Sequence, residues 1–341
     1  MESFANFKSH PFVPRYDLRK LKDTSMFQGN RRRKKYFEGW YFKMVSPDGA
    51  SILSVIPGIS LSQNGEEQHA FIQIIDGKTA NTFYYEFPIE DFHFSKDKFA
   101  VRIGKNFFSE DCLILDIHNA TTNIKGEVQM SNHVYLSRKK DKKKSIMGWY
   151  RFVPFMECYH GVVSLNHTLK GAITKDHITY NYDNGVGYIE KDWGKSMPSS
   201  WIWIQSNNFD SERTSFMLSI ANIPWLGSSF TGFLGFFLNE GTVHQFGTYT
   251  HAQIHVETTN SETIKIIITD KVHTYYIETY RDKSGLLKAP VKGSMDRRIA
   301  ESVDAVLKLT VVDKNKKLIF QDTTSVAGLE IVGDKEEFME T

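Results

Sequence analysis

Cysteine is almost absent from this chain: two of its 341 residues, Cys112 and Cys158, carry a thiol. Two cysteines do not make a disulfide framework, so we expect a reducing compartment. Long apolar runs are also missing, because the nearest one, Trp225–Leu238, is interrupted by three glycines and falls short of the roughly 18 residues of a membrane-spanning helix. The N-terminal stretch contains charges and prolines but no apolar core of a signal peptide. These absences predict a cytoplasmic protein.

Motifs for nucleotides, metals and serine nucleophiles are missing as well. The chain has no phosphate-binding loop, no GxGxxG after a strand, no GxSxG and no HExxH. His251 and His255 are four residues apart, but Thr250–Glu257 alternates like a strand and would place both on an exposed face. A net charge of +2 gives no general attraction to nucleic acid. We therefore expect no metal, no cofactor and no nucleic-acid partner.

No segment has a sustained helical period of apolar residues, and strand patterns fill the chain instead. Short alternating runs, such as Ser51–Ile56, Ala70–Ile75 and Thr263–Thr269, are separated by glycine-containing or charged turns. We predict an all-β fold of two antiparallel barrels with few short helices, because a closed barrel has no exposed edge and holds one small ligand. A pair of immunoglobulin-like sandwiches is the alternative.

The barrels are predicted as a pair because the chain matches itself with a period of roughly 140 to 160 residues. Trp40–Lys43 aligns with Trp201–Ile204, and Ala70–Gly77 aligns with Gly232–Asn239 in the same order. A repeat of this length implies two copies of one domain rather than a solenoid or a propeller. We place the N-terminal domain at residues 1–187 and the C-terminal domain at residues 188–341.

Two strand-like regions place acids among large aromatic side chains: Tyr36–Lys43, and Tyr188–Gly194 with Trp201–Gln205 after it. Strand alternation puts Glu190 and Asp192 on one face of their strand, and puts Glu38 on the same face as Trp40 and Phe42. Burial among aromatic rings and repulsion between neighbouring carboxylates both raise a carboxyl pKa toward that of a usable general acid. The regions therefore predict acid chemistry on an apolar, unsaturated molecule.

These residues resemble a known family. The segments Phe37–Phe42, Gly187–Gly194, Trp201–Gln205, Leu287–Pro290 and Ala327–Gly333 resemble the tocopherol cyclase family, and Arg138–Lys144 and Met156–His160 resemble its bacterial-type branch. The resemblance implies tandem lipocalin-like barrels, a fold shared with carotenoid hydratases and lipocalin-like Diels–Alderases. It also implies a cofactor-free intramolecular lyase or isomerase: a carboxylic acid protonates the alkene of a prenyl chain, and a phenolic oxygen captures the tertiary cation as a chromanol ring.

We assign this acid chemistry mainly to the second region. Asp192 is the expected proton donor, Glu190 is the neighbour that keeps it protonated, and Glu38 is a further candidate. His160 and Tyr159 are the next catalytic candidates, and His160 would pair with the acid or deprotonate a phenol. The aromatic side chains expected to bind substrate are Trp40, Phe42, Trp193 and Trp203. The structural alternative is that the acids form ion pairs between the barrels, that the tryptophans are core, and that His160 is a hydrogen-bonded core histidine.

Two function classes remain open: an isoprenoid cyclase, and a non-catalytic carrier of a hydrophobic small molecule. Either one needs an apolar pocket, which we expect inside the first barrel, and a partner such as a prenylated quinol. The basic runs Arg31–Lys35 and Arg138–Lys144 would make peripheral contact with an anionic membrane surface. Solvated loop tips are the alternative explanation of these runs.

Overall fold

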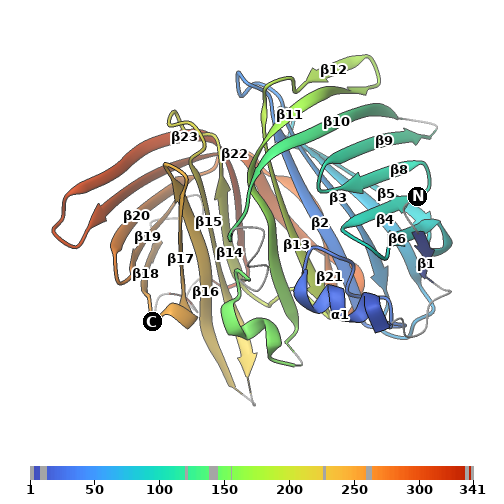
Figure 1. Cartoon of the computed structure of the whole chain (residues 1–341), viewed down its shortest axis with the longest axis horizontal. Helices are drawn as coiled ribbons and strands as arrows, with labels where there is room; N and C mark the ends of the chain where they lie inside the picture. The colour runs from blue at the N-terminus through green and yellow to red at the C-terminus, as the bar shows by residue number, and fades with distance from the viewer. Residues whose placement is uncertain are drawn as a thin grey trace.

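The protein is described by a computed structural model, which covers residues 4–7, 14–119, 122–137, 145–154, 156–225, 228–258, 263–334 and 338 (Figure 1). The fold is all-β, as predicted, with two large antiparallel sheets. In these residues one α-helix, α1 (Pro14–Lys22), accompanies the short 3-10 helices η2 (Ile89–Asp91), η3 (Gly148–Phe152) and η4 (Thr248–Thr250). None of the described helices is long and apolar enough to span a membrane. The basic run Arg138–Lys144 lies outside the described residues.

The first sheet is built from the N-terminal part of the chain. Its strands are β1 (Phe4–Asn6), β2 (Tyr36–Val45), β3 (Ile52–Leu61), β4 (Gln68–Asp76), β5 (Asn81–Pro88), β6 (Phe92–Ser95), β7 (Ala100–Ile103), β8 (Asn106–Ser109), β9 (Cys112–His118), β10 (Asn123–Val134), β11 (Cys158–Lys175), β12 (Ile178–Asn181) and β13 (Val186–Gly194). The strand order is β1-β6-β7-β8-β9-β10-β11-β13-β2-β3-β4-β5, and β12 pairs with β11.

The second sheet repeats this plan with the rest of the chain. Its strands are β14 (Trp201–Ser206), β15 (Ser215–Trp225), β16 (Ser228–Asn239), β17 (Thr242–Gly247), β18 (Gln253–Thr258), β19 (Thr263–Thr269), β20 (His273–Tyr280), β21 (Gly285–Val291), β22 (Ser294–Asp313) and β23 (Leu318–Val332). The order is β17-β16-β15-β14-β23-β22-β20-β19-β18, and β21 pairs with β22.

The two sheets share a strand order that matches the sequence repeat. The run β13-β2-β3-β4-β5 in the first sheet corresponds to β23-β14-β15-β16-β17 in the second. The aligned tryptophans Trp40 and Trp201 fall on the equivalent strands β2 and β14. The chain passes between the sheets after β13, which is a central strand of the first sheet. The division into domains at residue 187 stays a prediction.

The two faces of the first sheet have different surroundings. Side chains alternate across a strand, so neighbouring residues of β2 and β13 face opposite ways. Trp40 is paired with Lys191, and their face packs on a core of aromatic and aliphatic residues within the first half. Tyr41 is paired with Glu190, and their face lies toward the second sheet, where Tyr41 joins Trp203 in a separate apolar cluster. We call the region between the two sheets the seam; β13 and β14 lie near the middle of the molecule (Figure 1).

Candidate active site

A cavity of about 210 Å³ lies at the seam. Its walls come from both sheets, and aromatic rings form much of them: Phe37, Tyr41, Phe71, Tyr150, Trp201, Trp203, Phe230, Phe233 and Tyr249. The sequence had favoured a pocket inside the first barrel. That interior is filled by large side chains, including Trp40, Phe42 and Phe108, which are almost completely buried. The apolar cavity is therefore made by the pairing of the two halves rather than by one of them.

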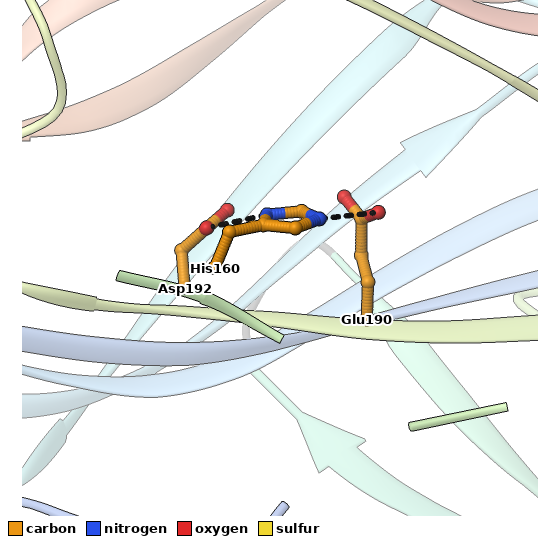
Figure 2. Close-up of side chains that lie close together, drawn as sticks. All are labelled: His160, Glu190 and Asp192. Atoms are coloured by element: carbon orange, nitrogen blue, oxygen red, sulfur yellow. Dashed lines mark hydrogen bonds and ion pairs between the residues drawn. The ribbon is translucent and has the colours of Figure 1, made fainter. Parts of the chain in front are cut away.

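Three of the predicted catalytic residues meet at this cavity: His160, Glu190 and Asp192. Antiparallel pairing of β11 with β13 places His160 directly opposite Asp192, and Glu190 is two residues further along on the same face. The His160 Nδ1–H donates to Asp192 Oδ1 over 2.8 Å, and His160 Nε2 lies 3.5 Å from Glu190 Oε2. Figure 2 shows the imidazole ring held between the two carboxyl groups. The histidine thus connects the two acids.

Glu190 is the buried member of this group, with 4% of its surface exposed. Its Oε2 accepts hydrogen bonds from the Tyr188 hydroxyl at 2.7 Å and from Trp203 Nε1 at 3.2 Å. Burial raises the pKa of Glu190 to about 7, against the opposing effect of the positive charge on His160. A substantial fraction of this carboxyl therefore carries a proton at neutral pH.

His160 has the opposite balance of effects. Burial lowers the pKa of His160, but the negative charges of Asp192 and Glu190 outweigh burial and raise that pKa to about 9. The Asp192 side chain is 27% exposed, whereas the His160 and Glu190 side chains are 11% and 6% exposed. The imidazole therefore lies between a partly exposed acid and a buried acid, an arrangement suited to proton transfer.

Two acids that the sequence analysis missed line the same cavity. Glu301 on β22 and Glu330 on β23 are directly opposite one another in the second sheet. Burial, followed by the neighbouring charge of Glu330, raises the pKa of Glu301 well above its ordinary value, so this group stays protonated and donates a hydrogen bond to Glu330. Burial raises the pKa of Glu330 to about 7. The available signal was a single acid inside an apolar alternating strand, as in Leu329–Ile331.

Hydrogen-bond donors are exchanged across the seam. Tyr41 of the first sheet donates its hydroxyl proton to Glu301 Oε1 of the second sheet over 2.7 Å. Trp203 of the second sheet donates to Glu190 of the first sheet. Each half therefore supplies an aromatic donor to a buried acid of the other half, which fixes both carboxyls relative to the cavity.

Glu38 lies on the other face of the first sheet, away from the cavity lining. Its Oε1 is 2.6 Å from Lys191 Nζ, and both side chains are completely buried. The backbone N–H groups of Gln28 and Gly29 and the Tyr36 hydroxyl also donate to this carboxylate. These contacts correspond to the structural alternative, in which Glu38 is held in an ion pair.

The remaining predicted site residues divide between the core and the cavity. Trp203 lines the cavity, whereas Trp40 and Phe42 belong to the first core. The Trp193 ring lies 4.7 Å from Lys191 Nζ and stacks on the Tyr159 ring at 5.6 Å. Tyr159 donates its hydroxyl proton to the carbonyl of Val153 over 2.7 Å. Among the described residues, the aromatic contacts of the cavity therefore come mainly from positions that the sequence did not single out.

His160, Glu190 and Asp192 are also the set that would hold a metal ion, since their ligand atoms lie within 4.8 Å of one another. Metal ligands must be deprotonated. The direct hydrogen bond between His160 and Asp192 and the raised pKa of Glu190 keep protons on this group instead. The chemistry of the donor set fits a proton relay better than a metal centre.

Comparisons with known proteins agree with the fold and the motifs. The chain is 31% identical over 80 residues to a probable chloroplastic tocopherol cyclase of Oryza sativa subsp. japonica, a match that covers 24% of this chain and 17% of that protein. It is 34% identical over 70 residues to the chloroplastic tocopherol cyclase of Zea mays, covering 20% and 15%. The matches thus span about a sixth of the length of these relatives.

Solved structures extend the comparison to the whole fold. The crystal structure of CghA with Sch210972 is similar to this chain with a TM-score of 0.53, at 6% sequence identity, over 88% of this chain and 89% of that chain. The likeness shows a shared fold in which two sheets pack together. The tocopherol cyclase-like family matches residues 115–333, which include His160 and the seam acids Glu190, Asp192, Glu301 and Glu330. The chain belongs to the tocopherol cyclase-like family.

Proposed function

We propose that this protein is an isoprenoid cyclase that protonates the alkene of a prenyl chain and closes a ring onto a phenolic oxygen of the same molecule. One observation carries the proposal: Glu190 is a buried carboxyl with a pKa raised to about 7, and it faces an apolar, aromatic cavity. A general acid works best when its pKa lies near the operating pH. Glu190 meets this condition while staying in a site of low polarity.

The reaction balances without a second reactant. The Glu190 carboxyl proton adds to the less substituted carbon of a trisubstituted alkene, the π bond breaks, and a tertiary cation forms. The phenolic oxygen attacks that cation, the C–O bond forms, and the phenolic proton leaves. The product is an isomer of the substrate. Aromatic faces at the cavity, such as those of Tyr41 and Trp203, attract the developing cation.

The surrounding groups have separate tasks in this scheme. Asp192, the donor favoured from the sequence, becomes the solvent-exposed end of the relay that returns a proton to Glu190 through His160. Glu330 has a pKa near 7 and lies on the second sheet, so it is suited to accept the phenolic proton. The Glu301 carboxyl keeps Glu330 hydrogen-bonded and stays neutral itself.

The test is a reaction in D₂O with a panel of prenylated hydroquinols. A cyclase of this kind yields products that contain one carbon-bound deuterium, because the added proton comes from a carboxyl in exchange with solvent. Mass spectrometry after back-exchange into H₂O detects this atom. A carrier would retain the prenylated quinols at one-to-one stoichiometry and return them without deuterium, and that result would replace the cyclase with the non-catalytic alternative.

A further inference from the structure

Exposed apolar side chains gather where α1 meets η3. Leu18 and Leu21 on α1 are 62% and 60% exposed, and Trp149 and Phe152 on η3 are 58% and 68% exposed. Large apolar groups that stand singly on a surface need no explanation, but four of them on two adjoining elements form a patch. In Figure 1 α1 and the green helical turn of η3 lie in the lower half of the molecule.

A direct hydrogen bond joins the two elements. Arg151 of η3 donates from Nη2 to the carbonyl oxygen of Leu21 over 3.1 Å, although the two residues are 130 positions apart in sequence. The Arg151 guanidinium also lies 4.4 Å from the centre of the Phe152 ring. The Trp149 ring stacks on Tyr150 at 4.1 Å, and Tyr150 lines the seam cavity. The exposed patch therefore continues into the wall of the cavity.

Positive charge surrounds the apolar side chains. Arg15, Arg19 and Lys22 are exposed on α1, and Arg19 is paired with the exposed Asp97 at 2.5 Å. The acid of this helix, Asp17, is buried and is paired with Lys20 at 3.2 Å and with Arg31 at 2.6 Å. The contact with Arg31 places the exposed basic run 31–35 beside α1. We define the α1–η3 surface as Leu18, Leu21, Trp149 and Phe152 together with Arg15, Arg19, Lys22 and Arg31.

We propose that the α1–η3 surface docks onto an anionic lipid bilayer. Aromatic and aliphatic side chains enter the boundary between headgroups and acyl chains, and arginine and lysine side chains around them attract anionic headgroups. Both kinds of residue are present here on one surface, which is the charge and polarity complement of such a membrane. Docking would bring the cavity wall at Tyr150 close to the lipid, so that a membrane-dissolved molecule has a short path to the seam.

The experiment is flotation of the purified full-length protein with vesicles, without substrate. Vesicles of equal parts phosphatidylcholine and phosphatidylglycerol should carry the protein upward, and vesicles of phosphatidylcholine alone should carry much less. The double variant Trp149→Ser/Phe152→Ser should lower the partition coefficient at least about tenfold. Its matched control is Ile178→Ser/Leu318→Ser. These two side chains are 63% and 53% exposed but lie outside the α1–η3 surface, so their replacement should leave binding unchanged.

A charge-reversal pair tests the electrostatic part. Arg15→Glu/Lys22→Glu should weaken binding to anionic vesicles about a hundredfold, and the difference should shrink in high salt. The control reverses the exposed residues Lys271 and Lys308 on the second half of the chain. Equal binding to both vesicle types, or equal losses in the control variants, would overturn the proposal. So would a wild-type dimer that Trp149→Ser/Phe152→Ser converts to a monomer, because the surface would then bind a second copy.

This inference stands apart from the proposed function. Vesicle binding needs no turnover, and the α1–η3 variants leave the seam acids untouched. Binding without cyclisation would refute the proposed reaction alone, and deuterium incorporation without binding would refute the membrane surface alone.

Discussion

Replacing Glu190 by glutamine is the most informative single change. The amide keeps the size of the side chain, and its oxygen can accept the hydrogen bonds that Tyr188 and Trp203 now donate to one carboxyl oxygen. The amide cannot give up a proton to an alkene. The substitution therefore removes the proposed proton donor while preserving the contacts that position it.

The expected loss of activity follows from the role of a general acid. Removing such a group costs about 10²- to 10⁴-fold in rate. We expect kcat to fall within this range and KM for the prenylated quinol to change little, because the aromatic walls of the cavity remain. In the wild type, activity should fall as the pH rises through about 7, because Glu190 loses its proton there. This pH dependence should be absent from the residual activity of the variant.

Stability provides a second, independent readout. The folded-state pKa of Glu190 is raised from an ordinary value of 4.5 to about 7. A raised pKa contributes stability that is fully present below the unfolded-state value and is lost as the pH rises through the folded-state value. The free energy of unfolding of the wild type should therefore fall by roughly 3 kcal/mol between about pH 4.5 and pH 8 through this group. Glu190→Gln should lack this component.

Urea unfolding of both proteins across this pH range, together with the D₂O assay, tests the argument. The control is Glu257→Gln, which changes an exposed acid on β18 and should affect neither readout. A Glu190→Gln protein that incorporates deuterium at the wild-type rate would refute the assignment of the donor. A constant stability difference between the two proteins from low to high pH would refute the raised pKa.

Three further substitutions separate the roles of the other residues. Glu38→Gln breaks a buried ion pair, so urea unfolding should show a loss of about 3–5 kcal/mol, while turnover per folded molecule stays unchanged. Asp192→Asn should lower turnover at least about tenfold and lower the pKa of His160 from about 9, which NMR titration of the imidazole can measure; an unchanged titration would contradict the pairing. Trp203→Phe removes a hydrogen-bond donor that favours the ionised form of Glu190. The fall in rate at high pH should therefore shift to a higher pH, and an unchanged pH profile would contradict this contact.

The architecture was accessible from the sequence because it depends on local patterns. Alternating apolar residues and the order of the repeated segments predicted an all-β chain of two similar antiparallel barrels, and the structure has two large antiparallel sheets with a corresponding strand order. Alternation also grouped Glu190 with Asp192 correctly. These properties depend on neighbours within one or two strands, so a single sequence contains them.

The composition of the site depended on pairings that a sequence does not contain. Asp192 is paired with Gly39, so Glu38 and Glu190 fall on opposite faces of one sheet. In the sequence, the two segments that contain these acids have the same pattern of acids among aromatic residues. Both faces of β13 meet apolar clusters, and its own residues do not reveal which face borders a cavity. Glu301 and Glu330 enter the site because β22 and β23 pair with each other and pack on the first sheet, which no local pattern reports.

The exchange of donors across the seam links the folding of the two halves. If the second sheet unfolded alone, Glu190 would lose the Trp203 donor; if the first sheet unfolded alone, Glu301 would lose the Tyr41 donor. In each case the carboxyl in the half that stays folded would also lose its apolar neighbours and become exposed to solvent. Unfolding of either half alone is therefore disfavoured. The chain should unfold more cooperatively than two independent domains joined by a linker. The two aromatic hydrogen bonds that hold Glu190 and Glu301 at the cavity therefore also couple the folding of the two halves.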